Sequence, residues 1–266
     1  MKPGISPLLL LLTSLIGLGA FLYPFFLPPS RTGEPGAHGG DAPLVLVLLV
    51  GLCLVVLLAD LETRRLDARQ IALLGVLVAT NAAVRPIPGP GGFSALFVLP
   101  ILCGYVFGGG FGFLLGALSM LVSAFFTAGI GPWLPFEMYS LGWVGLSAGG
   151  LAAPLARLGR RGERPILAAW GLLMGLVYGA VMNLYFWPFV APETADPATA
   201  WDPAAGPLGA LVHYAAFYLT TSLPFDVVRG LGNLLLLALL AAPLLKLLRR
   251  FQERFTFTVV TLEGEN

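Results

Sequence analysis

The sequence predicts an all-α polytopic membrane protein, and three observations support this prediction. Of its 266 residues, 57% are hydrophobic and 11% are charged, whereas about a quarter of residues are charged in ordinary soluble domains. The 57 residues from Ala95 to Leu151 contain a single formal charge, Glu137. They are long enough for three helices that each cross a bilayer core of about 30 Å. The Lys and Arg residues, finally, concentrate on one side of the predicted spans.

Residues 1–68 are predicted to form two additional N-terminal transmembrane helices. The first apolar run, Ile5–Leu27, follows Lys2. A cleaved signal peptide is the alternative, but the run continues through an aromatic stretch to its end, which favours a retained helix. A Pro/Gly-rich loop is expected over residues 28–42, and a second span over Pro43–Leu61.

A third span is expected over Asp67–Val84. The aspartate at its start suits the positive end of a helix dipole, and Arg85-Pro86 stop the span on the far side. Three passes should follow within residues 95–151, separated at 108–110 and at 129–132. Consecutive glycines lower helix propensity at the first break, and a proline cannot continue an interior helix at the second.

The last part of the chain is predicted to hold two more spans, which brings the total to eight. The first is Pro165–Val190, followed by an acidic, proline-rich loop over residues 191–207. The apolar stretch Leu208–Leu248 is too long for one straight pass, and Pro224 divides it into a partly amphipathic lead-in and a final span. Residues 251–266 form a cytoplasmic tail that is too short for a domain.

Charge predicts the orientation of these helices. Twelve of the fifteen Lys and Arg residues lie in segments that share one side of the membrane with the N-terminus. The positive-inside rule therefore places both termini in the cytoplasm. The twelve are Lys2, Arg64, Arg65, Arg69, Arg157, Arg160, Arg161, Arg164, Lys246, Arg249, Arg250 and Arg254. The other three are Arg31, Arg85 and Arg229.

Composition and motifs exclude several classes of function. A net charge of +1 without a basic stripe provides no electrostatic footprint for nucleic acid. The sequence contains no zinc-ligand cluster, G-x-S-x-G or H-E-x-x-H motif. The glycines at 108–112 lack the Lys-Ser/Thr of a phosphate-binding loop, so the chain is expected neither to hydrolyse ATP alone nor to hold a cofactor or metal. Cys53 and Cys103 lie in apolar runs and are expected to be buried hydrophobic side chains.

Polar and aromatic residues are predicted to line a pocket near the outward ends of the spans. Asp226, Arg229 and Asn233 follow i, i+3, i+7 spacing, which puts them on one face of the final helix. Ionisable groups at membrane depth are costly and usually face a cavity or the protein interior. A pair that only locks helices together is the alternative. The same outward layer contains Arg85, Trp133, Glu137, Tyr139, Asn183 and Trp187. Each could alone be an interfacial anchor, but together they are typical of a small-molecule site.

Small residues at four-residue spacing mark two further helix faces. Such spacing lets helix backbones approach closely in lipid. On the seventh helix, ordinary internal packing is the first interpretation of Gly171, Gly175 and Gly179. On the third helix, a smooth face that can also receive another protein is formed by Gly75, Ala79 and Ala83.

Three stretches resemble the substrate-binding S component of an energy-coupling factor (ECF) vitamin transporter. They are residues 71–85, which include the small-residue face, the Gly-Pro-Trp-Leu-Pro-Phe-Glu of residues 131–137, and residues 222–233, which include Asp226 and Arg229. The resemblance covers about residues 69–250, a six-helix core. The two N-terminal helices are additions to that core.

The resemblance implies a chain without enzymatic activity that binds a vitamin or related micronutrient at the outer face of a prokaryotic cell membrane. Members of the family deliver their ligand by toppling in the membrane lipid against a transmembrane T component, driven by two ATPase subunits that use the ATP. The small-residue face of the family's first core helix corresponds to Gly75, Ala79 and Ala83. A glycine stands at the first of these positions, where alanine is usual.

The predicted pocket combines Arg, Asp/Glu and aromatic side chains, which suits an amphipathic, ring-containing vitamin, with a corrinoid as the first choice. The rival hypothesis is a membrane enzyme or assembly factor that acts on a lipid-borne substrate, with Asp226 as the acid/base group. The same helix face holds no second carboxylate, and the chain lacks metal ligands. Both observations count against the enzyme.

Overall fold

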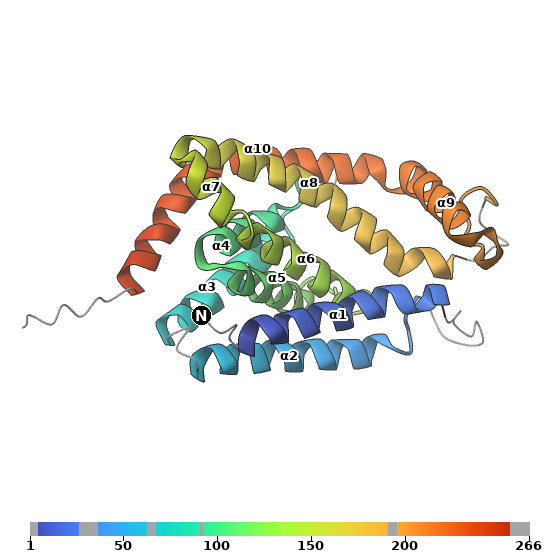
Figure 1. Cartoon of the computed structure of the whole chain (residues 1–266), viewed down its shortest axis with the longest axis horizontal. Coiled ribbons are helices and arrows are strands. Elements are labelled where there is room, and N and C mark those ends of the chain that lie inside the picture. The colour runs from blue at the N-terminus through green and yellow to red at the C-terminus, as the bar shows by residue number, and fades with distance from the viewer. Residues whose placement is uncertain (1–4, 27–36, 63–67, 91–92, 191–195, 256–266) are drawn as a thin grey trace, which may run out of the picture.

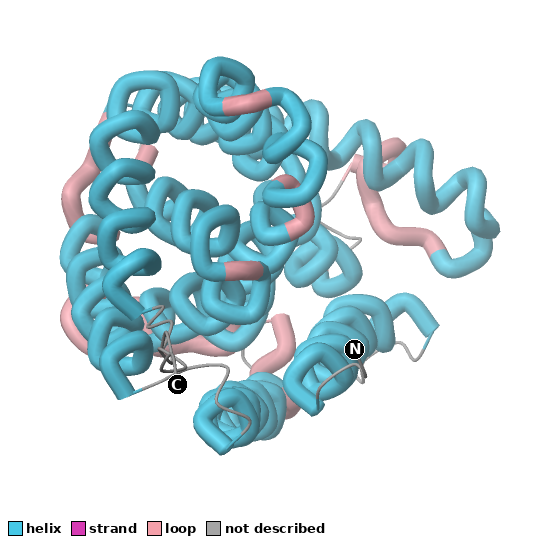
Figure 2. The backbone as a smooth tube through the Cα atoms, turned by 60° about the vertical axis from the view of Figure 1, so that its left-hand side comes forward, coloured by secondary structure: helices cyan, strands magenta, loops and turns pink. Residues whose placement is uncertain are grey.

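The computed structural model describes residues 5–26, 37–62, 68–90, 93–190 and 196–255. Within these residues all regular structure is helical, as Figure 2 shows. The α-helices are α1 (Ile5–Phe26), α2 (Ala42–Glu62), α3 (Ala68–Val84), α4 (Val98–Phe107), α5 (Gly109–Ala124), α6 (Leu134–Gly149), α7 (Ala152–Leu158), α8 (Arg160–Phe186), α9 (Gly206–Thr221) and α10 (Leu223–Phe255). Short 3₁₀ turns are η2 (Ala95–Phe97), η3 (Trp187–Phe189) and η4 (Pro203–Ala205).

Four helices in the described part of the chain are long and apolar enough to cross a membrane. They contain the spans Pro7–Phe26, Ala42–Asp60, Gly162–Phe189 and Leu223–Glu253. Shorter apolar helices cover Ala68–Val84, Ala95–Phe107 and Gly109–Ala124. The prediction of an all-helical polytopic membrane protein is therefore confirmed. The count of eight spans and the cytoplasmic side of both termini stay predictions.

The predicted helix breaks lie close to the observed ones. Gly108 separates α4 from α5 with a positive φ of 101°, a conformation that favours glycine. Pro224 occupies the second position of α10, where a helix tolerates proline because the first turn has no intrahelical acceptor for its N–H. The span predicted from Pro165 begins earlier, at Arg160, and the loop before it contains the short helix α7. Residues 28–36 of the predicted first loop and 256–266 of the tail lie outside the described residues.

Figure 1 shows how the helices are layered. The N-terminal pair α1 and α2 lies side by side along one side of the molecule. The long helices α8 and α10 pack together along the opposite side. Helices α4, α5 and α6 fill the space between these two pairs.

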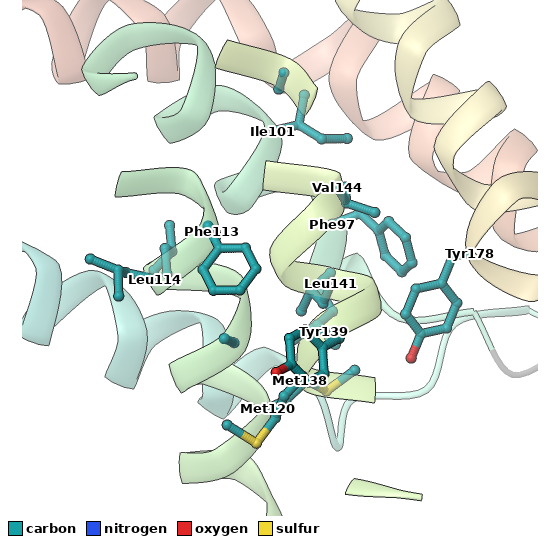
Figure 3. Packing of buried hydrophobic residues seen from close by; sticks show 14 of the residues in the cluster. Phe97, Ile101, Phe113, Leu114, Met120, Met138, Tyr139, Leu141, Val144 and Tyr178 are labelled. Atoms are coloured by element: carbon teal, nitrogen blue, oxygen red, sulfur yellow. The ribbon is translucent and has the colours of Figure 1, made fainter. Parts of the chain in front are cut away.

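The centre of the molecule depends on close approach between α4, α5 and α6. A Cβ added to Gly104 would overlap the carbonyl of Gly145, and one added to Gly145 would overlap the carbonyl of Gly112. Without a hydrophobic driving force between helices in lipid, such backbone-to-backbone packing is a main source of association. Figure 3 shows the large side chains beside this contact, among them Phe113 and Leu141, both fully buried.

The N-terminal pair docks on the core through α6. The Trp143 indole Nε1 donates a hydrogen bond to Ser14 Oγ on α1 at 3.2 Å. The ring of Phe21 meets Phe136 edge-on, with centroids 4.9 Å apart. Tyr139 packs against Gly17, where a Cβ would overlap its ring. Helices outside the predicted core therefore contact the helix that carries Glu137.

The two small-residue faces lie in different environments. Gly171, Gly175 and Gly179 face α10, where an added Cβ would meet Leu237, Gly230 and Asp226 respectively. The internal-packing interpretation of this stripe is confirmed. On α3 the three small residues are exposed, and nothing lies within 4 Å of a Cβ added to Gly75. The opposite face of α3 is the buried one and contains Leu74, Val78, Asn81 and Ala82.

Candidate functional site

The first functional feature is an ion pair that joins α3 to α6. Arg85 follows the last residue of α3, and its Nη2 donates to Glu137 Oε2 at 2.7 Å. Its Nη1 donates to Ser123 Oγ on α5 at 2.9 Å. The side chains of Arg85 and Glu137 are 18% and 19% exposed, so the pair is largely removed from solvent yet remains accessible.

The second feature is an ion pair at the start of α10. Arg229 Nη1 donates to Asp226 Oδ1, one helical turn earlier. The Asp226 side chain is 2% exposed and packs against Gly179 of α8, where no larger side chain would fit. Its burial is stabilised by Arg229, because an unpaired carboxylate at this depth would be strongly disfavoured. Arg229 is 28% exposed, and its Nη1 also donates to the Gly175 carbonyl of α8 at 3.5 Å.

Tyr178 of α8 lies between the two pairs. The Arg229 guanidinium carbon stands 5.2 Å from the centre of the Tyr178 ring. The ring of Phe97 contacts the same tyrosine edge-on at 5.1 Å, and Figure 3 shows the two rings beside each other. The Tyr178 hydroxyl interacts electrostatically with Glu137, Arg229, Arg85 and Asp226.

The two ion pairs belong to one site. Arg229 of α10 lies near enough to Glu137 of α6 to act on it electrostatically. We call this arrangement the paired-charge site and define it by Arg85, Glu137, Tyr178, Asp226 and Arg229. It offers two guanidinium groups as donors, two carboxylates as acceptors and an aromatic face, with the charges internally balanced. This chemistry suits binding of a polar, ring-containing molecule.

The connection between α3 and α4 reaches across this side of the molecule. Phe93 packs its ring over Gly232 of α10, at a point where a Cβ would overlap it. The Gly89 amide donates to the Phe93 carbonyl at 2.6 Å. The segment after Arg85 is therefore anchored to the helix that carries Arg229.

Several predicted site residues lie elsewhere. Asn233 is fully buried in the α8–α10 interface, where its Nδ2 donates to the Gly171 carbonyl at 3.3 Å. Tyr139 follows Glu137 by two residues and therefore faces away from it, toward Gly17 of α1. Trp133 is 41% exposed at the start of α6.

The last two turns of α8 and the adjoining turn η3 hold the remaining two predicted residues. Asn183 Oδ1 accepts a hydrogen bond from Ser222 Oγ at 2.9 Å, which links α8 to the junction between α9 and α10. Trp187 is buried, and its Nε1 donates to the Thr199 carbonyl at 2.8 Å. Its ring belongs to a separate aromatic cluster with Phe25, Trp201 and Tyr214.

Sequence reasoning did not identify Tyr178 as a member of the site or Phe97 as the residue that packs against it. Tyr178 directly precedes Gly179 of the small-residue stripe, so it flanks a predicted helix contact, and that position is the available signal. Both cysteines are free and buried, as expected. No cluster of three or more His, Cys, Asp or Glu residues suited to a metal ion occurs in the described part of the chain.

A family model described as "ECF transporter, substrate-specific component" matches residues 69–241. The match begins at the start of α3, extends into α10, and does not include α1 or α2. All five residues of the paired-charge site and the exposed face of α3 fall within it. No curated protein and no solved structure gives a significant match to the chain.

Proposed function

The chain belongs to the family of ECF transporter substrate-specific components, and from this premise we propose that it binds a vitamin or related micronutrient at the outer face of the plasma membrane of a prokaryotic cell. Membership makes it a multi-pass membrane transport subunit. Delivery of the ligand inward requires a transmembrane T component and two ATPase subunits, which supply the ATP hydrolysis.

The observation that supports ligand binding is the paired-charge site. Two acid–base pairs from distant parts of the chain converge on one tyrosine. Arg85, Glu137 and Arg229 of this site also remain partly accessible. A ligand that carries both hydrogen-bond donors and acceptors replaces the lost hydration of these groups.

The site chemistry supports an amphipathic ligand that contains a ring. Tyr178 and Phe97 provide flat apolar surfaces, and the guanidinium groups provide donors in a fixed geometry. A corrinoid remains our first choice within this class. The rival enzyme hypothesis is not favoured, because Asp226 is almost fully buried against α8 and the family consists of transport subunits.

The exposed face of α3 is the proposed contact with the T component. Gly75, Ala79 and Ala83 present small side chains outward, and the described chain leaves this face uncovered. Close backbone approach is favourable between helices in lipid, and a face without bulky side chains permits it. Surrounding membrane lipid would cover the same face when the chain is alone.

The test compares two glutamates that each pair with an arginine at 2.7 Å. Glu137 pairs with Arg85 in the proposed site, and Glu163 pairs with Arg249 near the other end of α8. Wild-type chain and the variants Glu137→Gln and Glu163→Gln are purified from cells, washed and denatured, and the released small molecules are identified by mass spectrometry. We expect the wild type and Glu163→Gln to release the same vitamin-like molecule and Glu137→Gln to release little. A wild type that releases none contradicts the proposed function, and equal release from Glu137→Gln contradicts the proposed site.

A further inference from the structure

His38 lies between α1 and α2 and is buried in the core, with 2% of its surface exposed. Four aromatic rings surround it, and we call them the aromatic cage. Its ring stacks on Tyr185 of α8 at 5.0 Å and lies 4.3 Å from Phe136 of α6. The other two rings are Tyr23 at 5.7 Å and Phe189 at 4.7 Å. A residue outside the family match thus reaches into the core between two of its helices.

The two nitrogens of His38 are in different situations. Nδ1 lies 2.7 Å from Asp41 Oδ2, and because an ionised carboxylate only accepts hydrogen bonds, Nδ1 carries a proton. In the neutral ring Nε2 is then an acceptor. Nε2 is buried and has no hydrogen-bond partner among the described residues. Buried polar atoms are rarely left unpaired, so in the neutral ring this nitrogen is an acceptor that lacks a donor.

The surroundings hold His38 firmly in this position. Its backbone has a φ of 58°, which is uncommon for a residue other than glycine. The Tyr185 hydroxyl donates to the carbonyl of Ala37, directly before it, at 2.9 Å. Conformations of this kind persist where the surrounding structure imposes them, and they concentrate at functional sites.

The aromatic cage adjoins the paired-charge site. Phe136 directly precedes Glu137 in α6. Tyr185 follows Tyr178 by seven residues, so both tyrosines lie on one face of α8. The Tyr185 hydroxyl interacts electrostatically with both Glu137 and Asp41. Two elements, α6 and α8, therefore connect His38 to the charged groups.

We propose that the N-terminal helix pair contributes a residue to the ligand site, with His38 Nε2 accepting a hydrogen bond from an N–H or O–H group of the ligand. Asp41 positions the ring by holding Nδ1, and the aromatic cage holds the ring from its sides. The inference rests on the proposed function and adds to it a specific contact and a required donor on the ligand. It also gives α1 and α2 a role in recognition.

The experiment uses the whole chain in nanodiscs. The same substitution is made separately at each of the two histidines of the sequence, which gives two variants. In His38→Asn the amide nitrogen still reaches Asp41, but no atom remains at the place of Nε2. His213→Asn is the matched control, because His213 Nδ1 contacts the Ala200 carbonyl at 3.0 Å and takes no part in the aromatic cage. The probe is an equimolar mixture of thiamine, riboflavin, biotin, folate, pantothenate, pyridoxine, nicotinate and cyanocobalamin. Mass spectrometry identifies the vitamin that the chain retains and measures the dissociation constant for it.

We expect His38→Asn to bind the vitamin that the wild type retains with an affinity at least about 10-fold lower, because a buried hydrogen bond is lost. His213→Asn should bind this vitamin with the affinity of the wild type. His38→Gln, whose amide reaches the place of Nε2, should recover part of the affinity. Unchanged affinity in a folded His38→Asn contradicts this inference and leaves the proposed function intact. A wild type that retains none of the vitamins contradicts both.

A second measurement serves if His38→Asn fails to fold. The His213→Asn chain contains a single histidine, whose ring nitrogens are observed by ¹⁵N NMR. Nε2 should be unprotonated and free of hydrogen bonds without vitamin, and its resonance should shift when the retained vitamin is added. A resonance typical of a hydrogen-bonded Nε2 before addition, or one that does not respond to the vitamin, overturns the inference.

Discussion

Three polar residues on one stripe of α10 occupy two different environments. Asp226 and Asn233 are seven residues apart and both meet α8, where Gly179 and the Gly171 carbonyl accommodate them. Arg229 lies between them in sequence and also contacts α8, at the Tyr178 ring and the Gly175 carbonyl, but its side chain is 28% exposed whereas the other two are buried. A shared helix face therefore does not imply a shared role. We therefore propose that Asp226 keeps Arg229 oriented and that Arg229 is the group that contacts the ligand.

The double variant Asp226→Asn with Arg229→Gln tests this division of roles. It roughly preserves volume and hydrogen-bonding capacity while removing both charges. We expect a folded protein whose ligand affinity is lower by about 1–3 kcal/mol, because a charge-assisted donor is lost. Isothermal titration with the vitamin that the wild type retains measures the change. Wild-type affinity in a folded double variant would mean that the pair serves only to lock α8 to α10.

At the scale of helices, the same small-residue pattern has two outcomes. The glycines of α8 are covered by α10, whereas the small residues of α3 are exposed. The difference arises because α8 and α10 are long antiparallel neighbours, while α3 turns its larger apolar side chains Leu74 and Val78 inward. The exposed face is then available to a helix of another subunit.

Adding one methyl group should affect the two faces in opposite ways. Gly179→Ala places a Cβ on the Asp226 carboxylate and should destabilise the protein by about 1–3 kcal/mol, as overpacking does. Gly75→Ala meets open space and should be neutral or stabilising by up to about 1 kcal/mol, because alanine is the better helix former. Thermal unfolding in detergent measures both. A destabilised Gly75→Ala would indicate that the α3 face packs within the chain.

A bulky residue on the α3 face should separate transport from binding. Ala79→Leu should abolish uptake by the assembled transporter while the isolated chain binds its vitamin normally, since Ala79 is exposed and is not one of the residues of the paired-charge site. Ala169→Leu, at an exposed position of α8, is the matched control and should transport like the wild type. Uptake in vesicles and ligand binding are measured in parallel. Lost binding together with intact assembly would contradict the assignment of this face to a partner.

At the scale of the whole molecule, basic residues gather at one end of the long helices. Arg164 near the start of α8 and Lys246, Arg249 and Arg250 near the end of α10 line a common cavity of about 560 Å³. The paired-charge site lies toward the opposite ends of these helices, because Tyr178 is in the second half of α8 and Arg229 is near the start of α10. His38 lies at the same end, where it stacks on Tyr185 of α8. This separation agrees with the predicted orientation, in which the basic end is cytoplasmic.

Cysteine labelling tests that orientation. In a chain with Cys53 and Cys103 replaced by alanine, single cysteines are introduced at Ala198 in the loop before α9 and at Arg157 in α7, both exposed positions. A membrane-impermeant maleimide added to intact cells should label position 198 and miss position 157, which should react only after the membrane is opened. The reverse pattern would invert the topology and place the proposed site on the cytoplasmic side.

The sequence by itself determined the class of the protein, the approximate extent of its helices and the family to which it belongs. Apolar runs, glycine breaks and charge asymmetry are local properties, so they can be read without knowing which helices touch. The contacts depended on tertiary structure. Arg85 and Glu137 are 52 positions apart, and no spacing rule indicates that they pair. Likewise, Tyr178 lies near the charged groups and His38 lies beside Phe136 only because contacts between distant parts of the chain bring α8 and the segment before α2 against α6.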